Sequence, residues 1–220
     1  MYSIKQNNID LYASLFKGRN DIYAVRWEKN EHSGYMPAYK VDWSDYKQHK
    51  AKGGTFKDYP KKELLPIDKQ AIKDHLEGKK TIGIYPLLED NTSWFIAVDF
   101  DKEKWKDTIL KLHHCCSEYR IPCYIERSRS GNGGHLWIFF KDPVPAEQSR
   151  KIMFELLRSS EIVSHFEKEP SFDRLFPNQD FHSGKGFGNL IALPLNGSSI
   201  EQNNSVFLEP KSMEPYNDQW

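Results

Sequence analysis

Two carboxylates close the most apolar stretch of this chain, the segment Ser93–Asp101 with the sequence SWFIAVDFD. From Trp94 to Asp99 five of six residues are apolar, which predicts a strand buried on both faces. Residues i and i+2 of a strand point the same way, so Asp99 and Asp101 share one face at its end. Such close carboxylates repel each other unless a cation lies between them, and Mg²⁺ or Mn²⁺ prefers these oxygen ligands. The alternative is that both aspartates cap the helix that follows.

A polar, glycine-rich segment, Ser128–His135 (SRSGNGGH), precedes the apolar strand expected at Leu136–Phe140. Its glycines let backbone N–H groups approach an anion closely, and successive N–H groups form a phosphate nest. The candidate phosphate-binding residues are Ser128, Arg129, Ser130, Gly131, Gly133 and His135. A plain hairpin turn is the alternative, but it needs only about two to five residues and no histidine at the start of the strand.

Further candidates follow in the segments 171–180 and 183–188. Asp173 would supply a third carboxylate, with Asp180 as the second choice, and three carboxylates can hold two divalent ions. Lys185, between glycines, would reach a γ-phosphate as a point charge, unless it is simply an exposed loop lysine.

The order of the elements predicts that these groups meet. From Trp94 onward the pattern is β-α-β-β-α-β, which indicates an α+β fold with a ferredoxin-like, or RRM-like, module. The expected helices and later strands are Lys104–Arg120, Cys123–Arg127, Leu136–Phe140, Ala146–Phe166 and Asn189–Leu195, with a long loop through Asp173 before the last. The first strand of this module lies between the third and fourth, so Asp99, Asp101, His135 and the Asp173 loop converge on one rim of the sheet.

The first 80 residues predict an α/β module that contributes to nucleic-acid binding, and residues 81–220 the RRM-like module that carries the carboxylates, the two together forming one domain. A short helix should end near Gly18, and strands at Ile22–Trp27 and Thr81–Leu88 should flank a helix at Pro66–Leu76. The segment 47–62 is predicted to be a flexible basic loop with interleaved aromatic residues, which suits single-stranded nucleic acid. Its candidate nucleic-acid-binding lysines are Lys50, Lys52 and Lys57. The alternative is a merely solvated loop.

Composition narrows the class of protein. Lysine plus arginine equals aspartate plus glutamate at 31 each, so any nucleic-acid contact must come from a local patch. No run of 18 apolar residues and no signal-peptide core is present, which predicts a soluble cytoplasmic protein. Three cysteines do not make a disulfide framework, and the histidines and cysteines of 113–123 lack zinc-ligand spacing.

Four segments resemble the archaeo-eukaryotic primase superfamily: AVDFD (97–101), ERSRSGNGGHLWIFF (126–140), FDRLFPNQD (172–180) and GFGNLIALPL (186–195). They match its D-x-D/E motif, its S-x-H-like loop and its later single aspartate, although the serine–histidine spacing here is longer than S-x-H. The resemblance is closest to the primase-polymerases of TOTE conflict systems and CRISPR-associated systems, and SLFKGRNDIYAVRWE (14–28) resembles their N-terminal part.

The resemblance implies a template-directed primase-polymerase that uses nucleoside triphosphates and single-stranded DNA, with two Mg²⁺ or Mn²⁺ ions. It places Asp99, Asp101 and Asp173 on the metals, and His135 with Ser128 or Ser130 on the nucleotide phosphates. Tyr85 resembles in position an aromatic residue that screens the sugar 2′ position, or else is an ordinary strand tyrosine. Further domains and conflict-system or CRISPR proteins are the implied partners.

Two other classes of protein fit less of the sequence. A non-catalytic nucleotide- or single-strand-binding RRM-like module would not require three carboxylates. A D-x-D glycosyltransferase would need a mostly parallel nucleotide-sugar-binding sheet.

Overall fold

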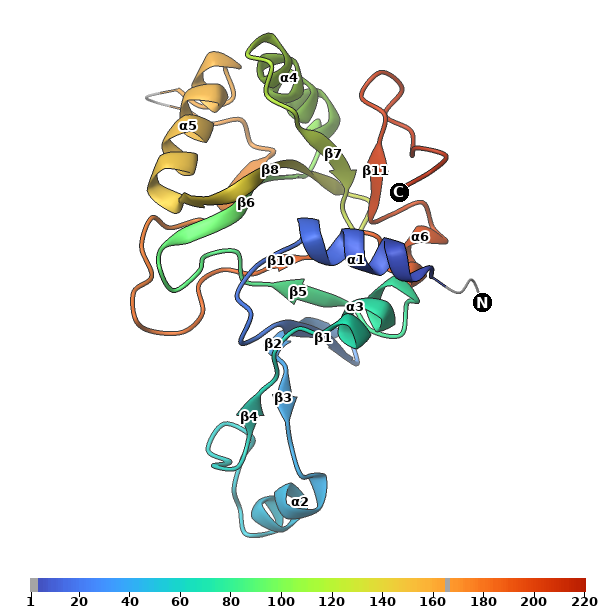
Figure 1. Cartoon of the computed structure of the whole chain (residues 1–220), viewed down its shortest axis with the longest axis vertical. Coiled ribbons are helices and arrows are strands. Elements are labelled where there is room, and N and C mark those ends of the chain that lie inside the picture. Colours follow the sequence, from blue (N-terminus) through green and yellow to red (C-terminus); the bar gives the residue numbers. More distant parts are fainter. Residues whose placement is uncertain (1–3, 165–166) are drawn as a thin grey trace.

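The computed structural model describes residues 4–164 and 167–220, which form two stacked antiparallel sheets, flanking helices and a projecting arm (Figure 1). The helices are α1 (Gln6–Leu15), α2 (Trp43–Ala51), α3 (Lys69–Leu76), α4 (Trp105–Glu118), α5 (Ala146–Ser159) and α6 (Gly197–Ile200). The strands are β1 (Ala24–Lys29), β2 (His32–Pro37), β3 (Tyr39–Lys40), β4 (Glu63–Leu64), β5 (Ile82–Ile84), β6 (Thr92–Asp101), β7 (Tyr124–Arg127), β8 (Gly133–Pro145), β9 (Phe172–Phe176), β10 (Ile191–Ala192) and β11 (Val206–Leu208). In the described part of the chain no helix combines the length and apolar character needed to cross a membrane.

The first sheet has the strand order β11-β7-β8-β6-β9, and its internal strand β6, paired with β8 and β9, ends in the two aspartates. Asp99 lies opposite His135 on β8 and opposite Arg174 on β9. The second sheet has the order β10-β5-β1-β2, so strands from both ends of the chain contribute to it. A mixed α/β architecture with antiparallel sheets is therefore established.

Strand β6 is buried on both faces because its alternate side chains enter two different cores. Ile96, Val98 and Phe100 pack into the core beneath α4 and α5. Phe95 and Ala97 pack into the core that the first sheet shares with β5, α1 and α3. Burial of each large apolar side chain contributes roughly 1.5–3 kcal/mol, so β6 is held firmly from both sides. The alternation carries Asp99 to the face that looks toward the second sheet.

Two predictions about the first sheet were wrong. The segment around Asp173, expected to be a loop, is strand β9 and pairs directly with β6. The segment Asn189–Leu195, expected to be the fourth strand, contributes only β10, which pairs with β5 in the second sheet. The difference has a physical reason in burial. Three apolar side chains of β9 are buried and anchor the strand, although Asp173 and Arg174 interrupt them: Phe172, Leu175 and Phe176.

Other boundaries also moved. The helix expected at Ala146–Phe166 ends at Ser159, and positions 165–166 lie outside the described residues. The segment 47–62, expected to be a flexible loop, belongs to a folded arm formed by residues 39–64. The arm consists of the stem β3–β4 and helix α2, and it projects below the second sheet (Figure 1). Asp42 caps α2 by accepting hydrogen bonds from the N–H groups of Ser44 and Asp45.

His75 joins α3 to the chain's C-terminal third through a fully buried ring. Its Nε2 donates to the carbonyl oxygen of Pro194 at 2.8 Å, and its Nδ1 accepts from the N–H of Ile82 at 3.2 Å. Both bonds require the neutral ring, because a protonated Nδ1 would face another donor. Burial lowers the pKa of His75 to about 4, although the Pro194 carbonyl opposes the shift.

We expect His75 to make the fold acid-sensitive. In the unfolded chain the ring has its ordinary pKa of about 6.5, so between pH 6.5 and 4 only the unfolded state binds the proton. Stability is therefore present above pH 6.5 and is lost as the pH falls toward 4, by about 2 kcal/mol between pH 7 and pH 5. Urea unfolding at the two pH values should show this loss in the wild type.

The matched variant is His75→Gln, which removes the titrating ring while every other group stays in place. It should be less stable than the wild type at pH 7, yet lose about 2 kcal/mol less on going to pH 5. Equal losses in the two proteins would contradict the assignment.

Candidate functional site

Three carboxylates from two neighbouring strands gather at the end of β6. Asp99 and Asp101 lie on β6 and Asp173 lies on β9, and one oxygen from each falls within 4.8 Å of the others. The pairing of the strands explains how Asp173 reaches this position. Asp99 pairs with Arg174 and Phe100 with Phe172, so Asp173 is an extra residue at a bulge. A bulge re-aims the side chain it carries, here toward the two aspartates of β6.

The cluster is electrostatically costly without a cation. Burial raises the pKa of Asp99 to about 6; the His135 ring lowers it, and the carboxylates of Asp101 and Asp173 raise it again. Arg174 donates from Nε to Asp173 at 2.6 Å and offsets part of the repulsion. Three clustered oxygen donors of like charge match the preference of hard divalent ions. The residues present therefore fit a divalent metal site.

His135 stands beside the cluster in a fixed orientation. Its Nε2 lies 3.5 Å from Asp99 Oδ1, and its Nδ1 lies 2.8 Å from Glu126 Oε2. The same Glu126 oxygen accepts a hydrogen bond from Trp137 Nε1 at 2.9 Å. Burial lowers the pKa of His135, but the nearby carboxylates, Glu126 first, outweigh this and raise the pKa to about 9. A cationic ring aimed at the cluster follows from this arrangement.

The glycines before His135 serve close packing as well as chain reversal. A Cβ atom at Gly133 would lie 2.4 Å from Asp101 Oδ1, and one at Gly134 would lie 2.4 Å from the Trp105 ring. Only glycine lets β8 begin so close to Asp101 and to α4. Gly131 has φ +77°, and its N–H donates to the carbonyl of Ser128. The hydroxyls of Ser128 and Ser130 lie 3.1 Å apart, and Arg129 is half-buried between them in the chain.

The structure does not bring every predicted residue to the carboxylates. Lys185 is exposed, and its loop is tied down where the N–H of His182 donates to Asn91 Oδ1 at 2.6 Å. Asn91 precedes β6, so this anchor lies a full strand, roughly 30 Å, from Asp101. Tyr85 is buried in a third apolar cluster with Ile22 and Ala24.

Asp180 and the three lysines also lie elsewhere. Asp180 accepts from Arg150 Nε at 2.6 Å and is not part of the carboxylate cluster. Lys50, Lys52 and Lys57 lie on the arm. Asp173 is therefore the third carboxylate by position, and its role stays a prediction.

Sequence reasoning missed several groups at this site. Glu126 lies opposite His135 in the β7–β8 pairing, so its place follows from the register of that hairpin. Lys102, Lys104 and Lys106 line a hollow next to Asp101, together with Glu103, Asp107 and residues of the glycine loop. The alternation of these lysines directly after the aspartates is their signal in the sequence, and the acidic residues of the hollow balance their charge.

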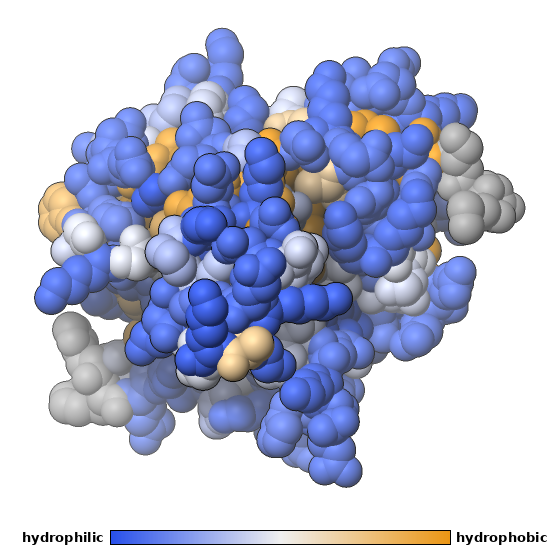
Figure 2. Space-filling view, turned by 90° about the horizontal axis from the view of Figure 1, so that it is seen from below, coloured by the Kyte–Doolittle hydropathy of each residue, from blue (hydrophilic) through white to orange (hydrophobic). Residues whose placement is uncertain are grey.

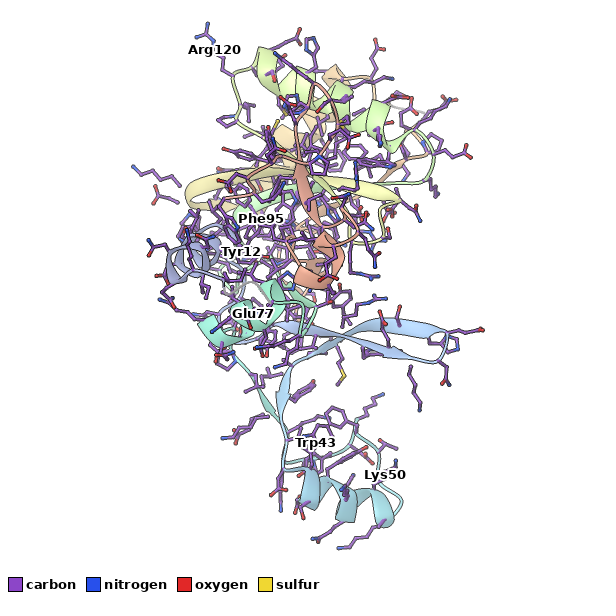
Figure 3. All side chains as sticks on the ribbon, turned by 90° about the vertical axis from the view of Figure 1, so that its right-hand side faces the viewer. Tyr12, Trp43, Lys50, Glu77, Phe95 and Arg120 are labelled. Atoms are coloured by element: carbon purple, nitrogen blue, oxygen red, sulfur yellow. The ribbon has the colours of Figure 1, made fainter. Side chains whose placement is uncertain are left out.

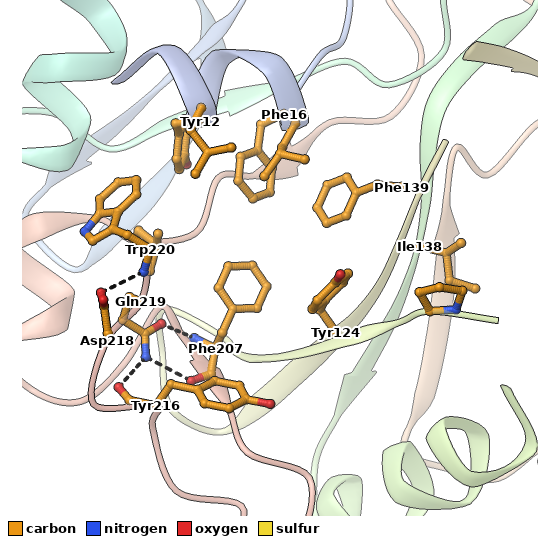
Figure 4. Close-up of a pocket in the computed structure, with 14 residues that line it drawn as sticks. Tyr12, Phe16, Tyr124, Ile138, Phe139, Phe207, Tyr216, Asp218, Gln219 and Trp220 are labelled. Atoms are coloured by element: carbon orange, nitrogen blue, oxygen red, sulfur yellow. Dashed lines mark hydrogen bonds between the residues drawn. The ribbon is translucent and has the colours of Figure 1, made fainter. Parts of the chain in front are cut away.

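A different hollow lies on the sheet face beside α1 (Figure 4). Its walls are mostly apolar, with Tyr124, Phe139 and Phe207 from the sheet and Trp220 from the C-terminal segment. Gln219 holds that segment in place by hydrogen bonds to the N–H and carbonyl of Phe207. None of the predicted site residues lines it.

Comparison with known proteins gives one family. The family model described as "TOTE conflict system, Archaeo-Eukaryotic Primase domain" matches residues 7–220. Among solved structures, the polymerase domain of Mycobacterium tuberculosis Ligase D in complex with DNA aligns with 10% identity and a TM-score of 0.38. That alignment covers 73% of this chain and 65% of the other. No curated protein matches.

We expect Glu126 to be a stability determinant as well as a support for His135. Glu126→Ala would leave two buried donors, His135 Nδ1 and Trp137 Nε1, without an acceptor, at a cost of roughly 1–3 kcal/mol each. Glu126→Gln keeps one oxygen in the same place and should lose clearly less stability in urea unfolding. Similar losses for both variants would contradict this account.

We also expect the carboxylate cluster to bind Mn²⁺ in the absence of any other ligand. Asp173→Asn should weaken binding measured by calorimetry or electron paramagnetic resonance at least about tenfold, because a charged oxygen donor is lost. Asp180→Asn is the matched control, since it changes the same side chain seven residues later, outside the cluster. Equal effects of the two substitutions would refute the choice of Asp173.

Proposed function

The chain belongs to the archaeo-eukaryotic primase domain family of TOTE conflict systems, and from this premise we propose that it is a primase-polymerase. It joins nucleoside triphosphates on a single-stranded DNA template, begins chains without a primer, extends them and releases pyrophosphate. The observation that carries the proposal is the convergence of Asp99, Asp101 and Asp173 from β6 and β9. Nucleotide or single-strand binding alone gives no reason to keep three repelling carboxylates together.

The proposed reaction is attack of a 3′-hydroxyl oxygen on the α-phosphorus of the incoming nucleotide. The new P–O bond forms as the bond to the bridging oxygen of the pyrophosphate breaks. Two Mg²⁺ or Mn²⁺ ions held by the three carboxylates would supply activation of the hydroxyl and neutralisation of the triphosphate. The chain itself contributes fixed positions and fixed charges, so catalysis comes mostly from orientation and electrostatic stabilisation.

His135 and the glycine loop are the proposed phosphate contacts. Glu126 holds the His135 ring so that its Nε2 points to the carboxylate cluster, where a phosphate would lie. Ser128, Arg129 and Ser130 add donors from the loop, and Gly131 and Gly133 allow close approach of the backbone. Lys102, Lys104 and Lys106 line the adjoining hollow beside Glu103 and Asp107, and their ammonium groups are the cations nearest in the chain to Asp101 that suit a phosphate. Lys185 and Tyr85 stay predictions without a contact to this group.

The strand order β9-β6-β8-β7 supports a ferredoxin-like, RRM-like arrangement for the catalytic module. We propose residues 1–80 as the nucleic-acid-binding module and 81–220 as the catalytic module. Both supply strands to the second sheet, which supports treating them as one catalytic domain. A cytoplasmic location and conflict-system or CRISPR partners belong to the same proposal.

Substitution of either β6 carboxylate should abolish synthesis while leaving the fold intact. Asp99→Ala and Asp101→Ala each remove a ligand from the cluster, and relief of carboxylate repulsion should keep the metal-free variants at least as thermally stable as the wild type. The assay is incubation with labelled nucleotides, Mn²⁺ and an unprimed single strand, followed by a denaturing gel.

Asp180→Ala serves as the control and should retain synthesis. Wild-type rates in the Asp99 or Asp101 variant would overturn the assignment of the carboxylates. Binding of nucleotide and template by the wild type with no pyrophosphate released would favour a binding module instead.

A further inference from the structure

The arm of residues 39–64 is folded around its own small aromatic core. Tyr59 is buried, and its ring centroid lies 5.4 Å from that of Tyr46, which lies 5.4 Å from that of Phe56. Lys62 Nζ donates to the carbonyl oxygens of Phe56 and Lys57 and closes the end of the arm. The arm is therefore a built structure that holds its surface side chains in place.

Most acidic residues of the arm accept hydrogen bonds from other groups of the arm. Asp42 caps α2, Asp45 accepts from Tyr59 Oη at 2.7 Å and pairs with Lys61, and Asp58 accepts from the N–H and hydroxyl of Thr55. Seven lysines stand against four acidic residues here, a net charge of +3, whereas the whole chain is neutral. The remainder of the chain thus carries −3, and the arm is a local basic feature.

Its free positive charge lies on the surface. Lys47, Lys50, Lys52 and Lys57 are all exposed, and none forms an ion pair with a carboxylate of residues 4–164 or 167–220. Figure 2, which looks at the molecule from below, shows a mostly hydrophilic surface on this side. Unpaired lysines on a rigid support are suited to a polyanion.

An aromatic ring stands among these lysines. Trp43 is 62% exposed, although large aromatic side chains are usually buried, and it stacks on Phe56, with ring centroids 6.5 Å apart. Trp43, Lys47 and Lys50 are spaced i, i+4 and i+7, so they form one stripe about 10 Å long on α2. Figure 3 shows Trp43 and Lys50 on the arm, below the two sheets.

We propose that this stripe binds the single-stranded template, with a base stacked on Trp43 and phosphates on Lys47 and Lys50. Every base has a face that stacks on an indole ring, and this combination of aromatic face and lysine is how proteins hold single strands without reading sequence. In a duplex the base faces are already stacked, so the surface favours single strands. Lys52 and Lys57, at the far end of α2 and in the following turn, extend the same charge.

This inference rests on the proposed polymerase function and deepens it. The arm lies beyond the second sheet, on the side away from the first sheet that carries the carboxylates (Figure 1). It therefore holds template at a distance from the reacting groups. The arm should set the apparent affinity for template and leave the affinity for nucleotide unchanged.

The test is fluorescence anisotropy with a labelled oligo-dT strand, without metal or nucleotide. Trp43→Ala should weaken binding about tenfold, and Trp43→Phe should restore most of it because a phenyl ring also stacks. Tyr119→Ala is the matched control, since Tyr119 is also 62% exposed but lies at the end of α4. Affinity for a blunt duplex should change less than twofold in Trp43→Ala.

A second variant, Lys47→Ala with Lys50→Ala, keeps the inference testable should Trp43→Ala disturb the arm. Loss of two phosphate contacts should reduce the slope of log affinity against log salt by about 1.4. Lys141→Ala should leave the slope unchanged, since Lys141 is an exposed lysine on β8 that forms no ion pair with a carboxylate of the described residues.

Unchanged single-strand binding in both arm variants would overturn the inference, as would equal losses on single strand and duplex for Trp43→Ala. A wild type that binds oligo-dT through the arm but makes no product would instead defeat the polymerase proposal. If the wild type synthesises and the arm variants bind like it, only the arm inference fails, and an acidic protein partner becomes the better occupant.

Discussion

The structure depends on holding like charges together at the end of one strand. Three carboxylates within 4.8 Å repel each other, and burial, followed by the charges of Asp101 and Asp173, raises the pKa of Asp99. The cost of this repulsion is met because β6 enters two apolar cores at once, with Val98 and Phe100 on one face and Phe95 and Ala97 on the other. A strand anchored on both faces cannot turn its end away to relieve repulsion. The rest of the site is arranged around this fixed end.

The partners of β6 complete the arrangement by different physical means. Strand β8 approaches so closely that Gly133 and Gly134 have no room for a side chain, which brings His135 opposite Asp99. Strand β9 supplies Asp173 through a bulge, so a residue that regular pairing would aim elsewhere joins the cluster. Behind His135, Glu126 satisfies two buried donors with one oxygen and fixes the ring. Close packing of β8 therefore places His135, the bulge in β9 places Asp173, and the hydrogen bond to Glu126 fixes the orientation of the His135 ring.

Local sequence was enough to predict the parts of this site whose signal is local. The apolar run before Asp99 identified β6, and the apolar run after the glycine loop identified β8, although β8 begins at Gly133 and not at Leu136. Both are patterns within about ten residues. Local sequence was not enough for β9, where Asp173 and Arg174 interrupt the apolar residues and resemble a loop. The partner that makes β9 a strand lies more than 70 residues earlier in the chain. The same limit put Asn189–Leu195 in the wrong sheet, since an apolar run does not say which strand it will pair with.

The arm was misread for a related reason. Helix α2 has no buried residue, so it lacks the apolar periodicity by which helices are recognised, and Gly53-Gly54 suggested flexibility. What holds the arm is a set of ring contacts between residues up to 17 positions apart, together with aspartates that accept hydrogen bonds from backbone and hydroxyl groups. Because the aspartates of the arm accept these internal hydrogen bonds, most of the exposed lysines of the arm have no carboxylate partner among the described residues. Charge balance in the sequence therefore conceals charge separation in space, and a neutral chain can present a strongly basic surface where its acids are used for folding.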